Sequence, residues 1–418
     1  MNADRHRLEA RDLAEAIAAR PENTAAGQKM LRERLTAKAA ALVPLLRAKA
    51  AETERSGRIP EEVLAAIDAA QLFRLRTPQR FGGFEGDIRT YMDVVTALGR
   101  GCGSTSWIGF ISIATVWIAA LFSDEAQREV FAGNPDVRFM GALGLTARAH
   151  AADGGYVLDG KWAYASNCQH AHWAVLSAPL PMGAVLVPSL LLVPMGDLAI
   201  EDSWHVVGMR GTGSHTVIAK DVFVPAHRTL SNETLAKGES PRSHIDEFVY
   251  RESFAPTAII AVAAPVLGLA QGALELTLER INKSPKAIAY SIYDDLRKAP
   301  SMQRELAEAA TLIDSAVVNV RRWCDHIAEA ARAGEELPFI RRAQMRMDLG
   351  YAMRLCRQAV GLLLNVQGAS AFAESNPLQR IWRDLEMASR HGLLAGEISQ
   401  EIYGRALVGN FESVSPMV

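Results

Sequence analysis

The middle of the chain, from Val137 to about Arg228, follows a pattern that differs from everything around it. Short apolar or alternating runs are separated there by Gly, Pro and Asp-Gly pairs, which is typical of β-strands joined by tight turns. The stretches on both sides are rich in Ala, Leu, Arg and Glu with helical spacing. We therefore predict an α+β fold that is mainly α, with a small β domain between helical parts.

The end of this stretch, Glu201 to Arg228, combines a Trp, a Gly-rich turn and an alternating apolar run. The alternation predicts strands with one buried face, and the glycines predict a sharp turn or a backbone that passes close to something flat. From the pattern alone, an ordinary hairpin is an equal alternative. The glycines are Gly208, Gly211 and Gly213, and the apolar residues are Val217, Ala219, Val222 and Val224.

Helical spacing dominates the two flanking regions. On the N-terminal side it predicts helices over Gln28–Ser56, Glu61–Gln71, Ile88–Gly99 and Ser104–Leu121. On the C-terminal side it predicts four long helices, over Ala261–Glu279, Ser301–Gly334, Phe339–Val366 and Leu378–Ala406. Four long helices with short connections indicate an up-and-down bundle. Small residues on one face of the first of them suggest close helix contacts, some between subunits.

These patterns divide the chain into four parts. They are an N-terminal tail or helix at 1–27, a helical domain at 28–136, a β domain at 137–240 and a C-terminal helical bundle at 241–418.

Charge and cysteine content exclude several classes of protein. The 45 basic and 47 acidic residues give a net charge of −2, without the basic patch of a nucleic-acid-binding protein. The four cysteines are widely scattered, so neither a zinc site nor a disulfide framework is expected, and a reducing cytoplasm fits best.

Membrane association is not expected either. The N-terminus is charged throughout and lacks the apolar core of a secretory signal. The uncharged run Ala174–Met195 is long enough to span a bilayer, but prolines at 179, 181, 188 and 194 interrupt it. We predict a pair of buried strands around a turn there.

Four segments spread over residues 28 to 408 resemble signatures of the acyl-CoA dehydrogenase superfamily. They read PEEVLAAIDAAQLFRLRTPQRFGG, YVLDGKWAYASN, SWHVVGMRGTGSHTVIAKDVFVP and NPLQRIWRDLEMASRH. The resemblance implies that superfamily's fold, with an N-terminal helical domain, a central β domain and a C-terminal four-helix bundle, assembled as a homotetramer.

Two departures from the dehydrogenase pattern bear on the reaction. Counted from Arg383-Asp384, the position of the acidic base in many dehydrogenases is Gly392, and Glu386 and Glu397 are out of place. The segment Leu143–Asp153 also lacks the expected motif. A dehydrogenase with a base relocated to an earlier helix stays the alternative, and a helical scaffold that has lost its flavin is a third, non-enzymatic one.

Other features resemble the two-component, flavin-dependent monooxygenases of this fold. They are the run from Trp204 to Ser214, the CGSTSW segment ending at Trp107, and His391 after Arg-Asp. The resemblance implies an oxygenase component that takes reduced flavin from a separate reductase and reacts it with O2 to a C4a-hydroperoxyflavin. That species gives one oxygen atom to a small aromatic or natural-product substrate. The chain has no Rossmann Gly motif of its own, which agrees with a separate reductase.

The resemblance also assigns roles to individual residues. Ser166 is expected beside flavin N5, where a hydroxyl that accepts a hydrogen bond from N5–H slows decay of the hydroperoxide. His391 is the candidate acid/base, because imidazole can deprotonate a phenol or hold a charge near the peroxide. The cofactor-binding residues implied are Tyr164, Ser166, Trp204, Gly211, Thr212, Gln367 and Gly368, and the substrate-binding residues are Trp107, Phe110, Ile111, Thr115 and His391. No metal is expected.

Several details of the site stay open. Some relatives carry a second histidine where this chain has Thr115, so activation of a phenol by a histidine pair is in doubt, and an amine oxidised at nitrogen becomes an alternative substrate. The loop at Gln367 and Gly368, through which one subunit reaches its neighbour's cofactor, keeps one of two glycines, which favours FMN over FAD. His170 and His172, just past the flavin strand, are expected to be solvated loop residues.

Overall fold

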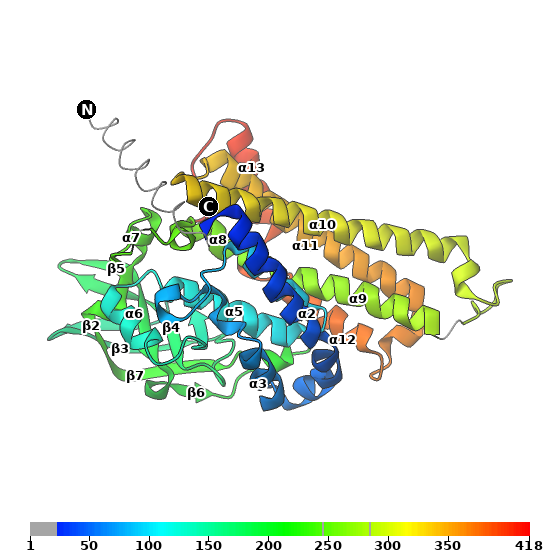
Figure 1. Ribbon diagram of the computed structural model, residues 1–418, viewed down its shortest axis with the longest axis horizontal. Helices are drawn as coiled ribbons and strands as arrows, with labels where there is room; N and C mark the ends of the chain where they lie inside the picture. The colour runs from blue at the N-terminus through cyan, green and yellow to red at the C-terminus, as the bar shows by residue number, and fades with distance from the viewer. Residues whose placement is uncertain (1–22, 245, 284–285) are drawn as a thin grey trace.

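The computed structural model describes residues 23–244, 246–283 and 286–418. Most of the predicted N-terminal tail or helix, residues 1–22, lies outside this part of the chain. The strands gather at one end of the molecule, the long C-terminal helices extend to the other end, and α2 and α5 lie between them (Figure 1).

The N-terminal helices follow the predicted spacing closely. The first begins after Thr24, whose side chain accepts a hydrogen bond from Gly27 N, and the helix at Ile88 begins after Asp87, which caps Thr90 N in the same way. Such caps satisfy backbone donors at a helix start and hold its first residue in register. The helices are α2 (Ala25–Ser56), α3 (Glu61–Ala69), α4 (Ile88–Gly99), α5 (Gly103–Ala119) and α6 (Asp124–Phe131).

The β domain consists of two four-stranded sheets, in the orders β1-β4-β5-β8 and β2-β3-β7-β6. The strands are β1 (Phe139–Ala142), β2 (Arg148–Ala152), β3 (Gly155–Trp162), β4 (Trp173–Met182), β5 (Val185–Pro194), β6 (Ala199–Glu201), β7 (Thr216–Pro225) and β8 (Thr229–Ser231). The predicted strand pair at Ala174–Met195 is confirmed, because β4 and β5 pair antiparallel along their whole length. The short strands β2, β6 and β8 were not predicted.

Strand β7 explains the spacing of the alternating run. Val217 and Ala219 are buried, and so are Val222 and Val224, with an extra residue between the two pairs. The register with β3 shifts at this point, and Asp221 has a φ of 53°. A bulge therefore restores the buried face after the break, as expected for one inserted residue.

The C-terminal region forms the predicted bundle with one correction. Its helices are α8 (Phe254–Ala261), α9 (Ala263–Lys283), α10 (Pro300–Ala333), α11 (Phe339–Gln367), α12 (Pro377–Ala388) and α13 (Gly396–Leu407). The single helix predicted over Leu378–Ala406 is wrong, because the chain leaves the helix after Ala388 and resumes it at Gly396. His391 lies in the break with a ψ of 138°, and its side chain accepts a hydrogen bond from Leu393 N, which replaces a backbone helix bond.

Close helix packing inside one chain accounts for the small residues of α9. A side chain on Gly268 would lie 2.3 Å from the carbonyl oxygen of Thr96, and one on Gly99 would lie 2.9 Å from Gly268 Cα. These glycines let α4 and α9 approach closely. The segment from Phe254 to Lys283 is long and apolar enough to cross a membrane, but 83% of its most apolar window is buried inside the protein, as in the core of a soluble bundle.

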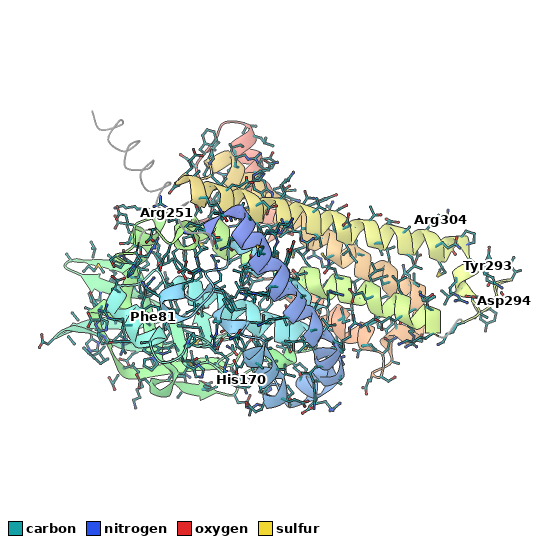
Figure 2. The ribbon with its side chains drawn as sticks, viewed as in Figure 1. Phe81, His170, Arg251, Tyr293, Asp294 and Arg304 are labelled. Carbon is teal, nitrogen blue, oxygen red and sulfur yellow. The ribbon has the colours of Figure 1, made fainter. Side chains whose placement is uncertain are left out.

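The connection between α9 and α10 lies at the far tip of the bundle. Figure 2 shows Tyr293 and Asp294 at this tip and Phe81 in the opposite half of the molecule. Tyr290 and Ile292 in the same connection are fully or almost fully exposed.

Candidate active site

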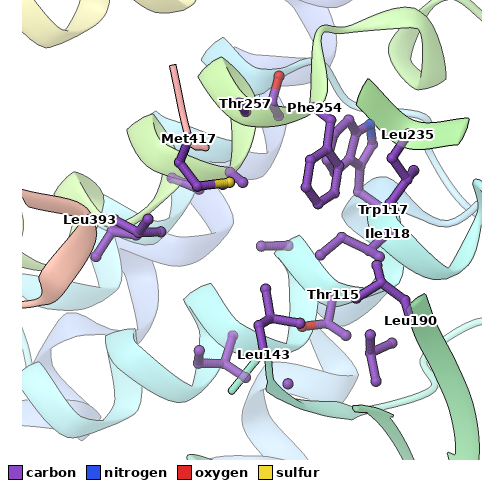
Figure 3. A pocket seen from close by; sticks show the side chains of 18 of the residues that line it. Thr115, Trp117, Ile118, Leu143, Leu190, Leu235, Phe254, Thr257, Leu393 and Met417 are labelled. Atoms are coloured by element: carbon purple, nitrogen blue, oxygen red, sulfur yellow. The ribbon is translucent and has the colours of Figure 1, made fainter. Parts of the chain in front are cut away.

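A large cavity lies where the β domain, α5, α8 and the break between α12 and α13 meet. Its volume is about 1340 Å³. Figure 3 shows apolar side chains around it, with Leu393 on one side and Trp117, Phe254 and Leu235 on the other. Charged residues such as Arg76, Arg242 and Glu252 also line it, but most of its surface is apolar, as is usual for a small-molecule site.

Most of the predicted site residues line this one cavity, although they come from distant parts of the chain. Gly211, Gln367 and Gly368 do not line it. The residues that do are Trp107, Phe110, Ile111, Thr115, Tyr164, Ser166, Trp204, Thr212 and His391.

Ser166 follows β3 and is held on both sides by side-chain hydrogen bonds. Its Oγ accepts a hydrogen bond from Nε1 of Trp107 at 3.1 Å and lies 2.7 Å from Oγ of Ser214. The neighbours Tyr164 and Asn167 both have positive φ angles, 59° and 71°. Two left-handed residues are costly and mark a segment whose shape is imposed by its surroundings.

The aromatic residues near Ser166 differ in their exposure. Tyr164 is 73% exposed and its ring lies 5.8 Å from that of Trp204, edge to face. An exposed aromatic ring at a cavity wall offers a surface for a planar ligand. Trp162 is buried and donates its Nε1–H to the carbonyl of Ser177 at 3.0 Å, so it belongs to the core of the β domain.

The Gly-rich turn packs against helices of the same chain. A side chain on Gly211 would lie 2.2 Å from Cγ2 of Thr53 on α2, and one on Gly208 would lie 2.4 Å from the carbonyl oxygen of Arg383 on α12. The close approach predicted for these glycines is therefore made with α2 and α12. It holds in place the turn that carries Thr212 and Ser214.

Asp384 binds the start of the Gly-rich turn at Met209. Its Oδ1 accepts a hydrogen bond from Met209 N at 2.5 Å, and Met209 has a φ of 54°. Burial raises the pKa of the Asp384 carboxyl to about 6, partly offset by the hydrogen bond from Met209.

His391 projects from the break between α12 and α13 toward Trp107. The two ring centroids are 5.8 Å apart. Nδ1 of His391 accepts a hydrogen bond from Leu393 N at 3.3 Å, and burial lowers the pKa of the imidazole. The ring is therefore neutral at neutral pH with its proton on Nε2, because Nδ1 is used as an acceptor.

His170 is a correction to the prediction from sequence. It is 8% exposed rather than solvated, and its Nε2 accepts a hydrogen bond from Ile59 N at 3.3 Å. Burial lowers its pKa to about 4, with a smaller contribution from the positive charges of Arg58 and Arg138. His172 is exposed as expected. Neither residue lines the cavity.

The described carboxylates that line the cavity do not include one that is both buried and unpaired. Glu252 is buried, but its side chain forms an ion pair with Arg76 and accepts a hydrogen bond from Ile88 N at 2.9 Å. Burial raises its pKa. The other glutamates of the lining, at 239, 335 and 336, are exposed. This arrangement weighs against a dehydrogenase with a relocated base.

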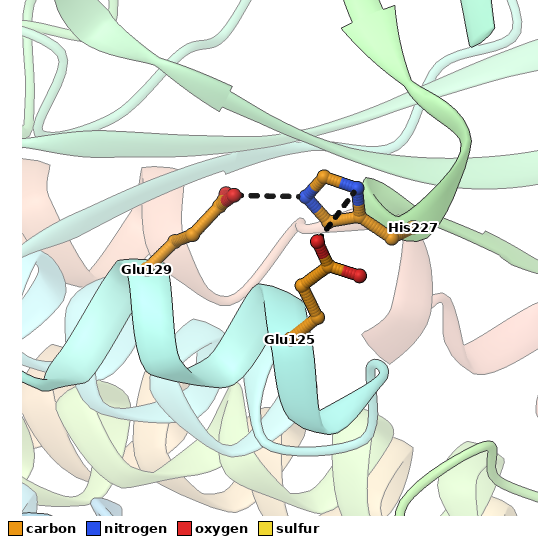
Figure 4. Close-up of side chains that lie close together, drawn as sticks. All are labelled: Glu125, Glu129 and His227. Atoms are coloured by element: carbon orange, nitrogen blue, oxygen red, sulfur yellow. Dashed lines mark hydrogen bonds and ion pairs between the residues drawn. The ribbon is translucent and has the colours of Figure 1, made fainter. Parts of the chain in front are cut away.

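One group of His and Glu side chains outside the cavity lies close enough together to consider as a metal site. Figure 4 shows His227 between Glu125 and Glu129, with 2.9 Å from its Nε2 to Glu129 and 3.8 Å from its Nδ1 to Glu125. Arg228 also pairs with Glu129 at 2.5 Å. Both glutamates are exposed, and Glu129 is already paired with Arg228, so we interpret the group as a surface polar cluster.

Three features of the site were not foreseen from sequence. Ser214 was noted only as the end of a motif, although its hydroxyl contacts Ser166. Asp384 was treated as a landmark of the C-terminal signature, although it holds the turn. The segment Pro416–Val418 returns to the cavity, where the carbonyl of Met417 accepts a hydrogen bond from buried Arg346. No local signal in the sequence marks that last contact.

Comparison with known proteins identifies the family. The N-terminal domain of acyl-CoA dehydrogenases matches residues 25–133, and the C-terminal domain matches residues 260–395. The oxygenase subunit HsaA of a flavin-dependent monooxygenase from Rhodococcus jostii is 34% identical over 374 residues, which is 88% of this chain and 97% of HsaA. The chain belongs to the flavin-dependent monooxygenases of the acyl-CoA dehydrogenase fold.

Further relatives of this monooxygenase agree. The oxygenase component of the FADH2-dependent resorcinol hydroxylase from Rhizobium is 32% identical over 90% of this chain and 94% of its own. The solved structure of XiaF from Streptomyces with FADH2 and glycerol superposes with a TM-score of 0.87 at 33% identity, covering 94% of this chain and 99% of XiaF. The monooxygenase is thus the oxygenase component of a two-component system, with a separate flavin reductase as partner.

The cavity of the monooxygenase fits a flavin. Its volume of about 1340 Å³ exceeds what a single drug-sized ligand needs, so a planar ring and a small substrate have room together. Tyr164 and Trp204 offer aromatic surface, and Ser166 offers a hydroxyl. When bound, a reduced flavin supplies the electrons that activate O2.

Proposed function

We propose that this monooxygenase hydroxylates, or oxygenates at nitrogen, a small and largely apolar aromatic substrate. The observation that carries the proposal is the meeting of Ser166, Trp107 and His391 in one apolar cavity. Ser166 would receive the N5–H of the reduced flavin. Trp107 and Phe110, whose rings meet edge to face at 5.1 Å, would form the wall that excludes water and contacts the substrate.

The geometry favours a donor role for His391. Because its Nδ1 accepts from Leu393 N, the neutral ring presents Nε2–H, and Nε2 has no hydrogen-bond partner among the described residues. An N–H donor can hold an oxygen atom in the cavity by a hydrogen bond. Deprotonation of a phenol by His391 would first require the loss of its contact with Leu393. Thr115 stands where some relatives have a second histidine, so a phenol would meet one imidazole here.

We infer that FAD is the first flavin to test and FMN the second. The resorcinol hydroxylase from Rhizobium, at 32% identity, is FADH2-dependent, and XiaF, at 33% identity, was solved with FADH2. This reverses the order expected from the single remaining glycine at Gly368.

The test combines flavin binding with turnover. The purified protein is titrated without O2 with reduced FAD and FMN, and is then supplied with O2, a flavin reductase and a panel of phenols, indoles and amines. Tight binding of reduced flavin and one oxygenated product are expected. Bleaching of bound oxidised FAD by an acyl-CoA, without oxygenated product, would instead establish the dehydrogenase alternative. Failure to bind any flavin would leave only a scaffold.

We also propose a homotetramer. Gln367 and Gly368 do not line the cavity of their own chain, and Gln367 instead donates a hydrogen bond to Thr277 at 2.9 Å. Their position at the end of α11 suits a contact with the cofactor of a neighbouring subunit. Light scattering after size-exclusion chromatography should give four times the mass of one chain, and a monomer that still binds flavin would overturn this role for the loop.

A further inference from the structure

Three hydroxyl groups form a continuous chain from the cavity to a backbone carbonyl. Oγ of Ser166 lies 2.7 Å from Oγ of Ser214, which lies 2.6 Å from Oγ1 of Thr212. Oγ1 of Thr212 lies 2.8 Å from the carbonyl oxygen of Met209. Ser166 also accepts the indole N–H of Trp107 at 3.1 Å. All three hydroxyl-bearing residues line the cavity and are buried.

The direction of every hydrogen bond in this chain follows from its end. A carbonyl oxygen only accepts, so Thr212 must donate its one proton to Met209. Ser214 must then donate to Thr212, and Ser166 must donate to Ser214. Ser166 has now used its proton and one lone pair, the latter for Trp107. What remains toward the cavity is a single acceptor lone pair.

The carbonyl at the end of the chain is firmly held. It also accepts Nε1–H of Trp204 at 3.1 Å, and the amide of the same residue, Met209, is bound by Asp384 at 2.5 Å. Gly208, one residue earlier, is packed against the carbonyl of Arg383. The amide of Thr212 also donates to this carbonyl, at 3.2 Å, so the carbonyl stays directed toward the residue whose hydroxyl proton it accepts.

We propose that Thr212 and Ser214 make the site selective for reduced over oxidised flavin by fixing Ser166 as a hydrogen-bond acceptor. This rests on the proposed place of Ser166 beside N5. The two redox forms differ at that atom, because reduced flavin carries an N5–H donor and oxidised flavin carries an N5 lone pair. An acceptor-only hydroxyl pairs with the first and opposes the second. Thr212 and Ser214 are thus positioning residues, and they act through Ser166.

Removing the hydroxyl of Thr212 should allow Ser166 to donate a hydrogen bond into the cavity. In Thr212→Val, the proton of Ser214 loses its acceptor and turns to Ser166. Ser166 is then free to donate its own proton into the cavity, toward the N5 lone pair of oxidised flavin. The ratio of the dissociation constants of oxidised and reduced flavin should fall on the order of tenfold, because one form loses a matched hydrogen bond while the other gains one. Ser214→Ala should lower the same ratio, because the proton of Ser166 loses its acceptor.

Two control variants separate this effect from general damage. Thr212→Ser keeps the hydroxyl and should keep the wild-type ratio. Thr257→Val makes the same change at another buried residue of the cavity, whose Oγ1 has no hydrogen-bond partner in the described chain, and should also leave the ratio unchanged.

The experiment is an anaerobic titration of each variant with oxidised and with dithionite-reduced FAD and FMN. Binding is followed by quenching of tryptophan fluorescence, and thermal unfolding of each variant is recorded beside it. The proposal is supported if the ratio of the dissociation constants of oxidised and reduced flavin falls in Thr212→Val and equals the wild-type ratio in Thr212→Ser. An unchanged ratio in a folded Thr212→Val that binds both forms overturns it and leaves the proposed function standing. Wild-type protein that binds neither form overturns the proposed function itself.

Discussion

Gly211→Ala tests how tightly the Gly-rich turn is docked. The added methyl would lie 2.2 Å from Cγ2 of Thr53, 3.0 Å from its carbonyl oxygen and 3.1 Å from Cβ of Ser104. Overpacking of a buried contact costs about 1–3 kcal/mol, and a distance of 2.2 Å to a methyl group places this variant toward the upper part of that range. The turn would have to move, and Thr212 and Ser214 would move with it.

The assay is equilibrium unfolding in urea at a fixed protein concentration. Gly404→Ala is the matched control, because a side chain at Gly404 meets nothing within 4 Å on α13, and it should stabilise the protein by about 0.5–1 kcal/mol. Adding Thr53→Ser to Gly211→Ala removes the closest methyl and should recover about 1 kcal/mol. A free energy of unfolding in Gly211→Ala equal to wild type, or no recovery in the double variant, would refute this account of the turn.

Three further predictions concern buried charged and titratable groups. Since the pKa of His170 is about 4, below the ordinary 6.5, the unfolded chain takes up the proton first as the pH falls. Stability should therefore drop by about 3 kcal/mol between about pH 6.5 and pH 4, and His170→Gln should flatten this part of a urea-midpoint profile. Arg76→Met strands Glu252 as an unpaired buried charge and should destabilise by about 3–5 kcal/mol, and Glu252→Gln added to it should recover most of the loss in the same assay. His391→Ala should lower the product formed per O2 consumed more than it lowers flavin affinity, because it removes the Nε2–H donor that lies beside Trp107, as measured with an oxygen electrode and product analysis.

Specific results would contradict each of these. A profile for His170→Gln that parallels wild type would mean that another group causes the acid sensitivity. A double variant at 76 and 252 no more stable than Arg76→Met would deny the coupling between the two charges. Normal product yield in His391→Ala would remove this histidine from the catalytic groups.

Much of the fold can be predicted from local patterns of apolar residues in the sequence. The approximate limits predicted for α4 agree with the structure, because the apolar spacing ends at Gly99, although the cap by Asp87 was not predicted. The buried face of β7 was visible in the alternation of Val217 to Val224, although the bulge that keeps it in phase was not. The meeting of Ser166 and His391 in one cavity was expected from the resemblance to a family, since no local pattern brings residues so far apart together.

What could not be predicted depends on distant contacts. No proline marks the helix break at His391 in the sequence. The hydrogen bond from Leu393 N to the His391 side chain, which caps the break, is seen only in the structure. The burial of His170 depends on the backbone amide of Ile59, which is remote in sequence. The contact of Ser214 with Ser166 could not be predicted either, because strands β4 to β6 separate the two residues in the sequence.

The interruption between α12 and α13 separates the residues that stabilise the fold from the residues that contact a substrate. Both helices carry apolar residues that pack in the bundle, such as Leu385 and Ile402, while four residues between them line the cavity, Arg390 to Leu393. Natural drift or directed evolution can therefore change positions 390–393, and with them the groups offered to a substrate, while the flanking helices and buried Leu394 keep the fold stable. A scaffold divided in this way can change its chemistry without first becoming less stable.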